Sequence, residues 1–461
     1  MSQTDFTTLN LKPELIENLV ALKYLEMTAI QAQSLPHILN GKDVIGQGKT
    51  GSGKTAAFGL GILNKLDVKK FRIQSLVLCP TRELADQVAK EIRKLARSIH
   101  NIKVLTLCGG MPFGPQAGSL EHGAHIIVGT PGRIDEHLRR NTLKLDSLNT
   151  FVLDEADRML DMGFEDDLDA IIDCIPGKRQ TLLFSATYPE QIESMAVRVM
   201  HQPVSVQVAS THDEASIKQY FYDIGDADRL ATLRLLLLHY RPQSALVFCN
   251  TKIATQAVAD ALSSEGFSAI ALHGDLEQRD RDQMLVRFAN KSSSILVATD
   301  VAARGLDIDA LDAVINYDIA HDSEVHIHRI GRTGRAGSKG IACTLFDRRE
   351  GHKVLRLEDD LDYKITVQPL PAIVSNNSQP YQSPMTSLQI DGGKKQKLRP
   401  GDILGALTAD KSIAGKQVGK IHLFDRCAYV AIERDAASAA LKILTEGKLK
   451  GRSFRVRQLK G

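Results

Sequence analysis

Tryptophan is absent from the 461-residue sequence, aromatic residues make up only 5% of it, and long apolar runs are missing. Even the stretch "LRLLLLHY" at 233–240 is too short to span a bilayer. The first residues, "MSQTDFTTLNLKPEL", lack the basic start and apolar core of a signal peptide. We therefore expect a soluble cytoplasmic protein with no membrane partner.

Closely spaced cysteine pairs are missing as well. The six cysteines stand at 79, 108, 174, 249, 343 and 427, and no C-x-x-C pair occurs among them. This spacing gives no indication of a zinc or redox site. We expect reduced cysteines that act mostly as small buried hydrophobic residues.

The net charge of +3 is distributed unevenly along the chain. From Met385 to Gly461 the sequence has sixteen Lys and Arg against seven Asp and Glu, so this segment carries +9 and the remainder −6. Positive charge concentrated on one short segment indicates a polyanionic partner, with nucleic acid as the first candidate.

The length suits about three domains. Short apolar runs such as "SLVLCP", "TFVLDEAD", "SALVFCN" and "SSILVATD" alternate with longer amphipathic segments, which predicts two parallel-sheet α/β domains. The stretch "VASTHDEASIK", about 208–218, reads as a hinge, and "QPLPAIVSNNSQPYQSPMTS" reads as an extended or mobile linker.

The tail after the second linker has the order strand, helix, strand, strand, helix, strand, which predicts a small α+β domain. Near its start, "IDGGKKQKLRPGD" places four cations directly behind two glycines. An isolated basic run is usually a solvated loop. Within a basic domain, contact with RNA becomes the alternative reading.

The strongest local signal is "GKTGSGKT", Gly48 to Thr55, which fits G-x-x-x-x-G-K-[ST] between an apolar strand and a helix. Glycines let successive N–H groups surround phosphate oxygens, Lys54 neutralises phosphate charge, and the Thr55 hydroxyl can hold Mg²⁺. The alternative is a flexible Gly/Ser turn.

A second signal, "FVLDEAD", ends another apolar strand about a hundred residues later. Asp154 is placed to hold Mg²⁺, and Glu155 can orient and deprotonate an attacking water. By itself "DEAD" could be a solvated helix start. After an apolar strand it predicts the second half of a nucleotide site.

Together these motifs resemble the DEAD-box RNA helicases from about Phe6 to Asp347. The resemblance extends to "PTRELA", "GG" at 109–110, "TPGR", "SAT", "TDVAARGLD" and "HRIGRTGR". It implies two RecA-like lobes, at 1–209 and 216–367, that close on ATP and RNA. A linker at 368–386 and an RNA-recognition-motif-like (RRM-like) domain at 387–461 would follow.

The resemblance assigns roles in ATP binding and hydrolysis. It implies arginine fingers at Arg332 and Arg335, which would stabilise the transition-state charge. For Arg329, an internal ion pair and a phosphate role remain open. His326 stands where many relatives carry tyrosine, and we assign it no catalytic role. The cofactor contacts implied are Phe6, Thr28, Gln31, Gly51, Ser52, Gly53, Lys54, Thr55 and Asp307.

At the adenine contact the family pattern is Thr-Pro-Ile-Gln, and this chain has alanine at position 29. Losing the proline should loosen the turn more than it affects the Gln31 amide, so we retain the ATP expectation.

RNA would lie along both lobes, held through phosphates and 2′-hydroxyls without regard to sequence. Ser185 and Thr187 would couple this track to the nucleotide site. The track residues implied by the resemblance are Arg82, Gly109, Gly110, Thr130, Arg133, Asn250, Gln278, Arg281 and Thr299.

The tail resembles that of the DbpA subgroup. An RRM normally stacks bases on aromatic residues, but here only Tyr429 is aromatic on the expected face. Basic residues must therefore contribute more, and this suits a folded hairpin. The subgroup implies a hairpin of 23S rRNA and a role in 50S subunit assembly. The tail contacts expected are Lys394, Lys395, Lys397, Arg399, Tyr429 and Arg455.

The leading hypothesis is thus an RNA-stimulated ATPase that unwinds short duplexes next to a tail-bound hairpin. An ATP-gated RNA clamp that unwinds little is an alternative from the class of binding proteins, and a DNA translocase is a third. No feature indicates an oligomer, so we expect a monomer.

Overall fold

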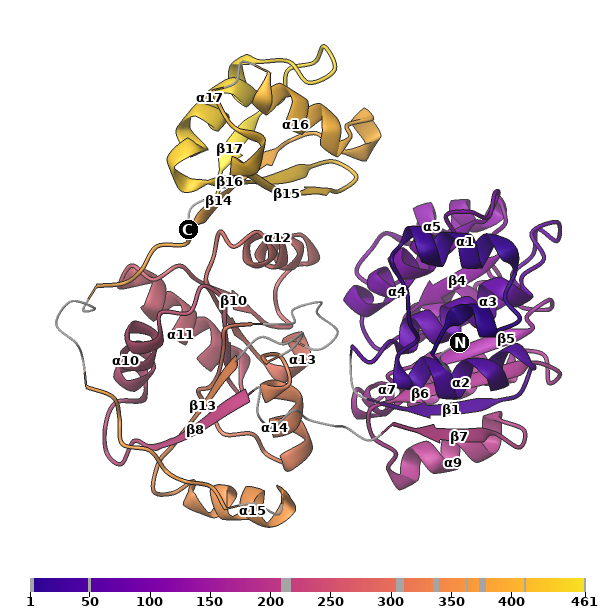
Figure 1. Cartoon of the computed structure of the whole chain (residues 1–461), viewed down its shortest axis with the longest axis horizontal. Helices are drawn as coiled ribbons and strands as arrows, with labels where there is room; N and C mark the ends of the chain where they lie inside the picture. Colours follow the sequence, from indigo (N-terminus) through magenta and orange to yellow (C-terminus); the bar gives the residue numbers. More distant parts are fainter. Residues whose placement is uncertain are drawn as a thin grey trace. The chain divides into compact units, whose positions relative to one another are not determined.

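The computed structural model describes residues 4–48, 51–208, 217–303, 311–334, 340–361, 364–372, 379–409 and 412–459. They form two parallel sheets and one smaller antiparallel sheet (Figure 1). The predicted fold class is therefore confirmed. Within the described residues, no helix has the length and apolar character needed to cross a membrane.

The first lobe has a seven-stranded parallel sheet in the order β3-β4-β2-β5-β6-β1-β7. Its strands are β1 (Val44–Gln47), β2 (Ser75–Leu78), β3 (Val104–Leu107), β4 (Ile126–Gly129), β5 (Thr150–Asp154), β6 (Gln180–Ser185) and β7 (Val204–Gln207). The helices are η1 (Phe6–Thr8), α1 (Pro13–Ala21), α2 (Ala29–Leu39), α3 (Lys54–Lys65), α4 (Arg82–Leu95), α5 (Phe113–Glu121), α6 (Pro131–Arg139), α7 (Ala156–Asp161), α8 (Glu165–Asp173) and α9 (Glu190–Val199).

Helices cover both faces of this sheet, so its central strands β2, β4 and β5 are buried on both sides. On β2, Val77 faces one core while Leu76 and Leu78 face the other. In the first core the rings of Phe58 and Phe184 lie 5.4 Å apart. Because all strands run the same way, the residues that follow them gather at one edge of the sheet.

The second lobe has a six-stranded parallel sheet in the order β10-β11-β9-β12-β13-β8. Its strands are β8 (Ile217–Asp223), β9 (Ala245–Phe248), β10 (Ala269–Leu272), β11 (Ile295–Ala298), β12 (Ala313–Asn316) and β13 (Gly340–Phe346). The helices are α10 (Arg229–Tyr240), α11 (Lys252–Ser264), α12 (Gln278–Ala289), α13 (Asp300–Ala303), α14 (Ser323–Ile330) and α15 (Gly351–Leu361).

The tail forms an antiparallel sheet in the order β15-β16-β14-β17, with the predicted succession of strands and helices. Leu388 and Val430 pack with Ile403 and Leu444 in its core. The elements are β14 (Met385–Ile390), η4 (Lys394–Gln396), α16 (Pro400–Thr408), η5 (Gly415–Gln417), β15 (Val418–Leu423), β16 (Ala428–Glu433), η6 (Arg434–Ala436), α17 (Ala437–Glu446) and β17 (Val456–Gln458).

The start of the tail is joined to the second lobe by a buried polar cluster. Ser387 Oγ accepts a hydrogen bond from Asn290 Nδ2 at 3.0 Å and lies 2.8 Å from Ser292 Oγ. Just before it, the ring of Tyr381 packs edge-on against Phe267. The described end of the predicted linker is thus fixed to the second lobe, because Tyr381 packs against that lobe and Ser387, just beyond it, is hydrogen-bonded to it.

Candidate nucleotide and RNA sites

The P-loop follows β1 and leads into α3. Gly53 adopts φ +97°, and a Cβ at this position would lie 2.5 Å from Gln31 Nε2 and 2.8 Å from Thr28 Oγ1. Only glycine fits there without displacing both side chains. Lys54, next in the chain, is buried and donates from Nζ to the Gly48 carbonyl at 2.6 Å. Its ammonium therefore lies inside the loop, where it can meet phosphate oxygens.

Asp154 and Glu155 lie at the same edge of the sheet, since β5 is separated from β1 only by β6. Burial raises the pKa of Asp154 to about 7, against the opposing charge of Lys54. Glu155 is buried in a left-handed conformation at φ +53°, and its Oε2 accepts from Arg158 Nη1 at 2.8 Å. Arg158 thus holds one carboxylate oxygen of the residue predicted to activate water.

The residues around the loop fit a magnesium nucleotide. Ser52 Oγ is buried with no hydrogen-bond partner in the described parts of the chain, so it can donate to a phosphate. Thr55 and Asp154 offer the oxygen ligands that Mg²⁺ prefers. Across the residues that the structure describes, no group of three or more His, Cys, Asp or Glu could hold a metal ion. Magnesium commonly takes only one or two carboxylates and completes its shell with phosphates and water.

The predicted adenine contacts adjoin this loop. Gln31 Oε1 accepts from the Thr28 backbone at 2.9 Å, and its Nε2 donates to the Gly53 carbonyl at 3.1 Å. Thr28 and Gln31 together form a capping box at the start of α2. The helix therefore begins at Ala29 without the proline of the family pattern. Phe6 is buried in the core of the first lobe. Asp307 lies outside the described residues.

The sequence motifs assign no role to Asp157, but in the folded lobe this residue links the acidic motif to the "SAT" segment. One of its carboxylate oxygens accepts from the Thr187 N–H and hydroxyl, both at 3.0 Å, and from the Ala186 N–H at 3.2 Å. Burial alone would raise the pKa of Asp157, but the Thr187 hydrogen bond and the nearby Arg158 charge lower it overall. Its position as the last residue of the "DEAD" string is the one feature of the sequence that indicates a role for Asp157.

The track residues predicted in the first lobe follow β2, β3 and β4, which are adjacent strands. The Gly109 N–H donates to Thr130 Oγ1 at 3.5 Å, and Arg133 donates to the Met111 carbonyl at 2.9 Å. Arg82 begins α4, and its Nη1 is buried with no hydrogen-bond partner among the described residues. The fold therefore brings backbone N–H groups, a hydroxyl and guanidinium groups to one edge.

In the second lobe, Arg329 occupies the centre of a buried network. Its Nε and Nη2 donate to both Asp300 oxygens at 2.7 Å, and Nη2 also donates to Asn250 Oδ1 at 2.7 Å. Its Nη1 donates to the Asp318 carbonyl at 2.6 Å and to Asn316 at 3.4 Å. All five donors are thereby used, so the internal ion pair is the arrangement present. One consequence is that Arg329 orients the predicted RNA contact Asn250.

The other predicted track residues of this lobe lie around α12 and α13. Arg281 Nη2 donates to the Ala302 carbonyl at 2.8 Å, and Thr299 Oγ1 accepts from the Ala302 N–H at 3.3 Å. Gln278, at the first turn of α12, donates to Asp282 at 2.8 Å. These contacts hold the polar side chains at the ends of β10 and β11.

Arg332 follows α14 and is buried in the second lobe. Arg335, the second predicted finger, lies outside the described residues. His326 on α14 is fully buried, and its Nε2 lies 3.3 Å from Gln219 Oε1. Burial, with a smaller contribution from the Arg329 charge, lowers the pKa of His326 to about 4. It is therefore neutral near pH 7.

In the tail, the four cations that follow Gly393 are exposed. A Cβ at Gly393 would lie 2.2 Å from the Phe424 carbonyl, so this glycine lets the basic turn pack against the β15–β16 connection. Arg455 is exposed and immediately precedes the edge strand β17. Tyr429, in contrast, is only 2% exposed, and its ring meets Phe424 edge-on. A Tyr429 contact with RNA would require this ring to be uncovered.

Three families match successive parts of the chain: DEAD/DEAH box helicase over 28–195, Helicase conserved C-terminal domain over 228–337, and DbpA RNA binding domain over 387–458. The chain is 54% identical over 458 residues to the ATP-dependent RNA helicase DbpA of Escherichia coli, which covers 99% of this chain and 100% of that protein. The chain belongs to the DEAD-box RNA helicase family.

Other relatives of this helicase share its two lobes. It is 45% identical to the DEAD-box ATP-dependent RNA helicase CshA of Geobacillus kaustophilus, over 75% of this chain and 74% of that protein. The structure of Saccharomyces cerevisiae Dbp5 bound to RNA and ADP BeF3 matches with a TM-score of 0.71 and 30% identity, over 80% of this chain and 96% of that chain. The helicase is accordingly an RNA-stimulated ATPase with an RNA-binding tail.

Proposed function

We propose that the tail directs this helicase to a hairpin of 23S rRNA, so that it unwinds short duplexes nearby during 50S subunit assembly in the cytoplasm, as a monomer. The observation that carries the proposal is the match of the tail to the DbpA RNA binding domain within a chain-long likeness to DbpA. The subgroup resemblance supplies the identity of the hairpin.

The tail's exposed cations support a structured RNA as its partner. Lys394, Lys395, Lys397 and Arg399 form one exposed basic turn. Lys450 lies beside it, since its Nζ donates to the Lys397 carbonyl at 2.8 Å. With Tyr429 buried, these cations are better placed than aromatic stacking to hold a hairpin through its phosphates.

For hydrolysis, we assign the catalytic roles to Lys54, Asp154, Glu155, Arg332 and Arg335. Glu155 takes a proton from the attacking water. Lys54 leaves the Gly48 carbonyl for phosphate oxygens. Mg²⁺, held by Thr55 and Asp154, would neutralise phosphate charge. The fingers add positive charge when the lobes close, so turnover depends on closure.

The coupling of hydrolysis to RNA follows a chain of contacts within the first lobe. Asp157 belongs to the acidic motif and binds Thr187. A shift of the acidic motif would therefore displace the "SAT" segment, which we assign to the coupling between ATP and the RNA track.

The test measures ATPase rates with no nucleic acid, generic RNA, DNA, and a 23S rRNA fragment that carries the hairpin. We expect half-maximal stimulation at a much lower concentration of the fragment than of generic RNA. Equal concentrations for both would refute the hairpin assignment. Stimulation by DNA equal to that by RNA would instead indicate a translocase.

Substitution of Lys394, Lys395 and Lys397 by alanine should raise the concentration of fragment required and reduce its dependence on salt. The matched control replaces three other exposed tail lysines, Lys416, Lys420 and Lys442. If both triple variants lose the same affinity, the basic turn contributes only general charge.

A further inference from the structure

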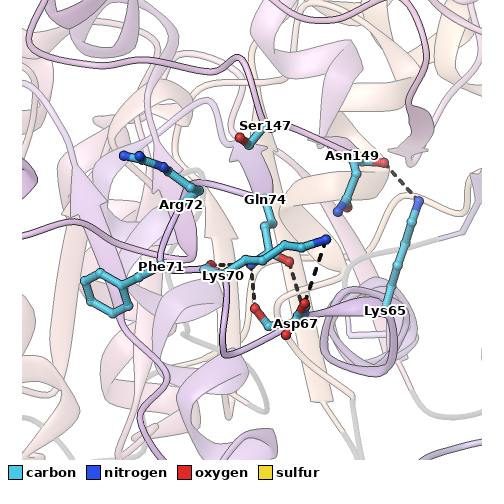
Figure 2. Close-up of a pocket in the computed structure, with 8 residues that line it drawn as sticks. All are labelled: Lys65, Asp67, Lys70, Phe71, Arg72, Gln74, Ser147 and Asn149. Carbon is cyan, nitrogen blue, oxygen red and sulfur yellow. Dashed lines mark hydrogen bonds and ion pairs between the residues drawn. The ribbon is translucent and has the colours of Figure 1, made fainter.

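A hollow of about 580 Å³ lies in the first lobe at the amino ends of β2 and β5 (Figure 2). Gln74 and Asn149, which immediately precede these two strands, line it. The P-loop follows the carboxyl end of β1, and Asp154 is the last residue of β5, so both lie at the opposite edge of the sheet. At about 3.3 Å per residue, the strands separate the two edges by roughly 15 Å. The hollow is therefore separate from the nucleotide site and from the predicted RNA track.

The hollow is electropositive. Lys65, Lys70 and Arg72 line it, with Asp67 as its single carboxylate. Asp67 Oδ1 is occupied by the Lys69 backbone N–H at 3.0 Å, and the ion pair between Asp67 and Lys70 is long, at 3.8 Å, and exposed. Such an exposed pair contributes little and leaves the lysine available. The surplus of positive charge favours a phosphate group.

The aromatic ring of Phe71 lies next to these cations in the lining of the hollow. Phe71 is 47% exposed, although it lines the hollow. His125 meets its ring edge-on with 4.7 Å between centroids. A Cβ at Gly123 would lie 2.6 Å from the ring, so this glycine makes room for it. The phenyl ring is thus braced by the protein and still offers surface on which a base can stack.

The backbone of the hollow is already fixed. The buried Gln74 amide accepts from the Asp67 N–H at 3.0 Å and donates to the Asp67 carbonyl at 2.7 Å and the Lys70 carbonyl at 2.8 Å. These three bonds close the turn that carries the cations and the ring. A ligand would therefore bind without ordering a loop first, which reduces the entropic cost of binding. Ser147 and Asn149 add polar groups at the rim, as Figure 2 shows.

We propose that this hollow binds a nucleotide of single-stranded RNA, with the base on Phe71 and the phosphate at Arg72, while Lys70 adds positive charge across the hollow. An unpaired strand is required because a base inside a duplex has no free face. The contact would act on RNA that extends beyond the track. It does not depend on which RNA the tail selects. It would lengthen the time the first lobe stays on such RNA without entering the hydrolysis step.

The absence of tryptophan allows a direct test. Phe71→Trp keeps an aromatic ring and introduces the only indole of the chain. Leu25→Trp, at a position that is 72% exposed in the same lobe, is the matched control. Each full-length variant is titrated with a single-stranded oligonucleotide, with uridine monophosphate and with inorganic phosphate, while indole fluorescence is recorded.

We expect saturable quenching of the Phe71→Trp protein by the oligonucleotide, at least tenfold weaker binding of the mononucleotide, and little response in the control. Adding Lys70→Gln and Arg72→Gln should weaken oligonucleotide binding about tenfold, with the ATPase kcat on a saturating short RNA unchanged. No quenching, or equal quenching in the control, would overturn the proposal. Equally tight mononucleotide binding would mean a free-nucleotide site, and a matching response to phosphate would mean a simple anion site.

Discussion

Asp157 accepts two hydrogen bonds from Thr187 through one carboxylate oxygen, from the backbone N–H and from the hydroxyl, both at 3.0 Å. We expect Asp157→Ala to leave these half-buried donors without their carboxylate acceptor and to release the "SAT" segment. Hydrogen bonds to a charged group contribute about 1.5–3 kcal/mol each. RNA-stimulated ATPase and unwinding should therefore fall about tenfold to a hundredfold, while nucleotide binding in the absence of RNA changes little.

The control for that variant is Thr187→Val, which removes only the hydroxyl bond and should have a smaller effect. ATPase and unwinding are measured with the same RNA. An Asp157→Ala protein that couples ATP to RNA normally would show that this link has no role in communication.

Arg329→Lys should disturb RNA binding although the guanidinium donors of Arg329 all bond within the second lobe. An ammonium group cannot replace five guanidinium bonds. Asn250 Oδ1 therefore loses its donor, and Asp300 is left poorly paired. We expect a loss of about 3–5 kcal/mol in the free energy of unfolding, as is usual when a buried ion pair is broken. The concentration of RNA for half-maximal stimulation should also rise about tenfold.

Asn250→Ala separates these two effects in part, because it should raise the RNA requirement as much while costing less stability, about 1.5–3 kcal/mol, since Arg329 keeps its Asp300 pair. In the Arg329→Lys background it should add little further loss. If the two substitutions instead act independently, Arg329 does not work through Asn250.

Gly53→Ala should strongly weaken nucleotide binding, since a Cβ there meets Gln31 and Thr28 at less than 3.0 Å and the backbone has φ +97°. The matched control is Gly41→Ala, which has φ +76° but nothing within 4 Å of the added Cβ. Both variants carry the left-handed strain of about 1 kcal/mol. We expect at least tenfold weaker binding of a fluorescent ATP analogue only for Gly53→Ala, and similar losses in both would make strain alone the cause.

His326 should make stability depend on pH in the acid range. Its pKa falls from 6.5 to about 4 on folding, so the unfolded chain takes up the proton first. The stability that results is complete above about pH 6.5 and is lost as the pH falls toward 4. At pH 5 the loss amounts to about 2 kcal/mol.

His326→Phe keeps a ring against Phe221 and removes the titration. The difference in urea midpoint between pH 7.5 and pH 5 should therefore be smaller for this variant than for the parent protein. An unchanged difference would mean that other groups, such as His137 with its similarly lowered pKa, account for the acid sensitivity.

The parts of the site that could be predicted from sequence depend on local order. Neighbouring residues are enough to predict a phosphate site from a glycine-rich turn between a strand and a helix. They are also enough to predict a metal site from two carboxylates at a strand end. Lys54, Asp154 and Glu155 were found in this way. Arg158 and Asp157 were not, because an arginine or aspartate at the start of a helix commonly faces water, and their partners became evident only in the folded lobe.

The tail shows the same division. The order of its strands and helices and its positive charge follow from hydrophobic periodicity and composition, which are properties of the chain itself. The burial of Ser387 does not, because Asn290 and Ser292, distant in the sequence, bond to it. The burial of Tyr429 against Phe424 likewise depends on how the β15–β16 connection folds.

The sequence by itself therefore determined the family, the three sheets and the residues of the nucleotide loop, since each is encoded within short segments. The tertiary structure alone decided which polar groups pair. Arg329 could have bound phosphate or carboxylate, and Asp300, Asn250 and Asp318 converge on it only when β9, β11 and β12 lie side by side. A buried guanidinium must satisfy all its donors where it lies, and that requirement cannot be evaluated until the sheet is assembled.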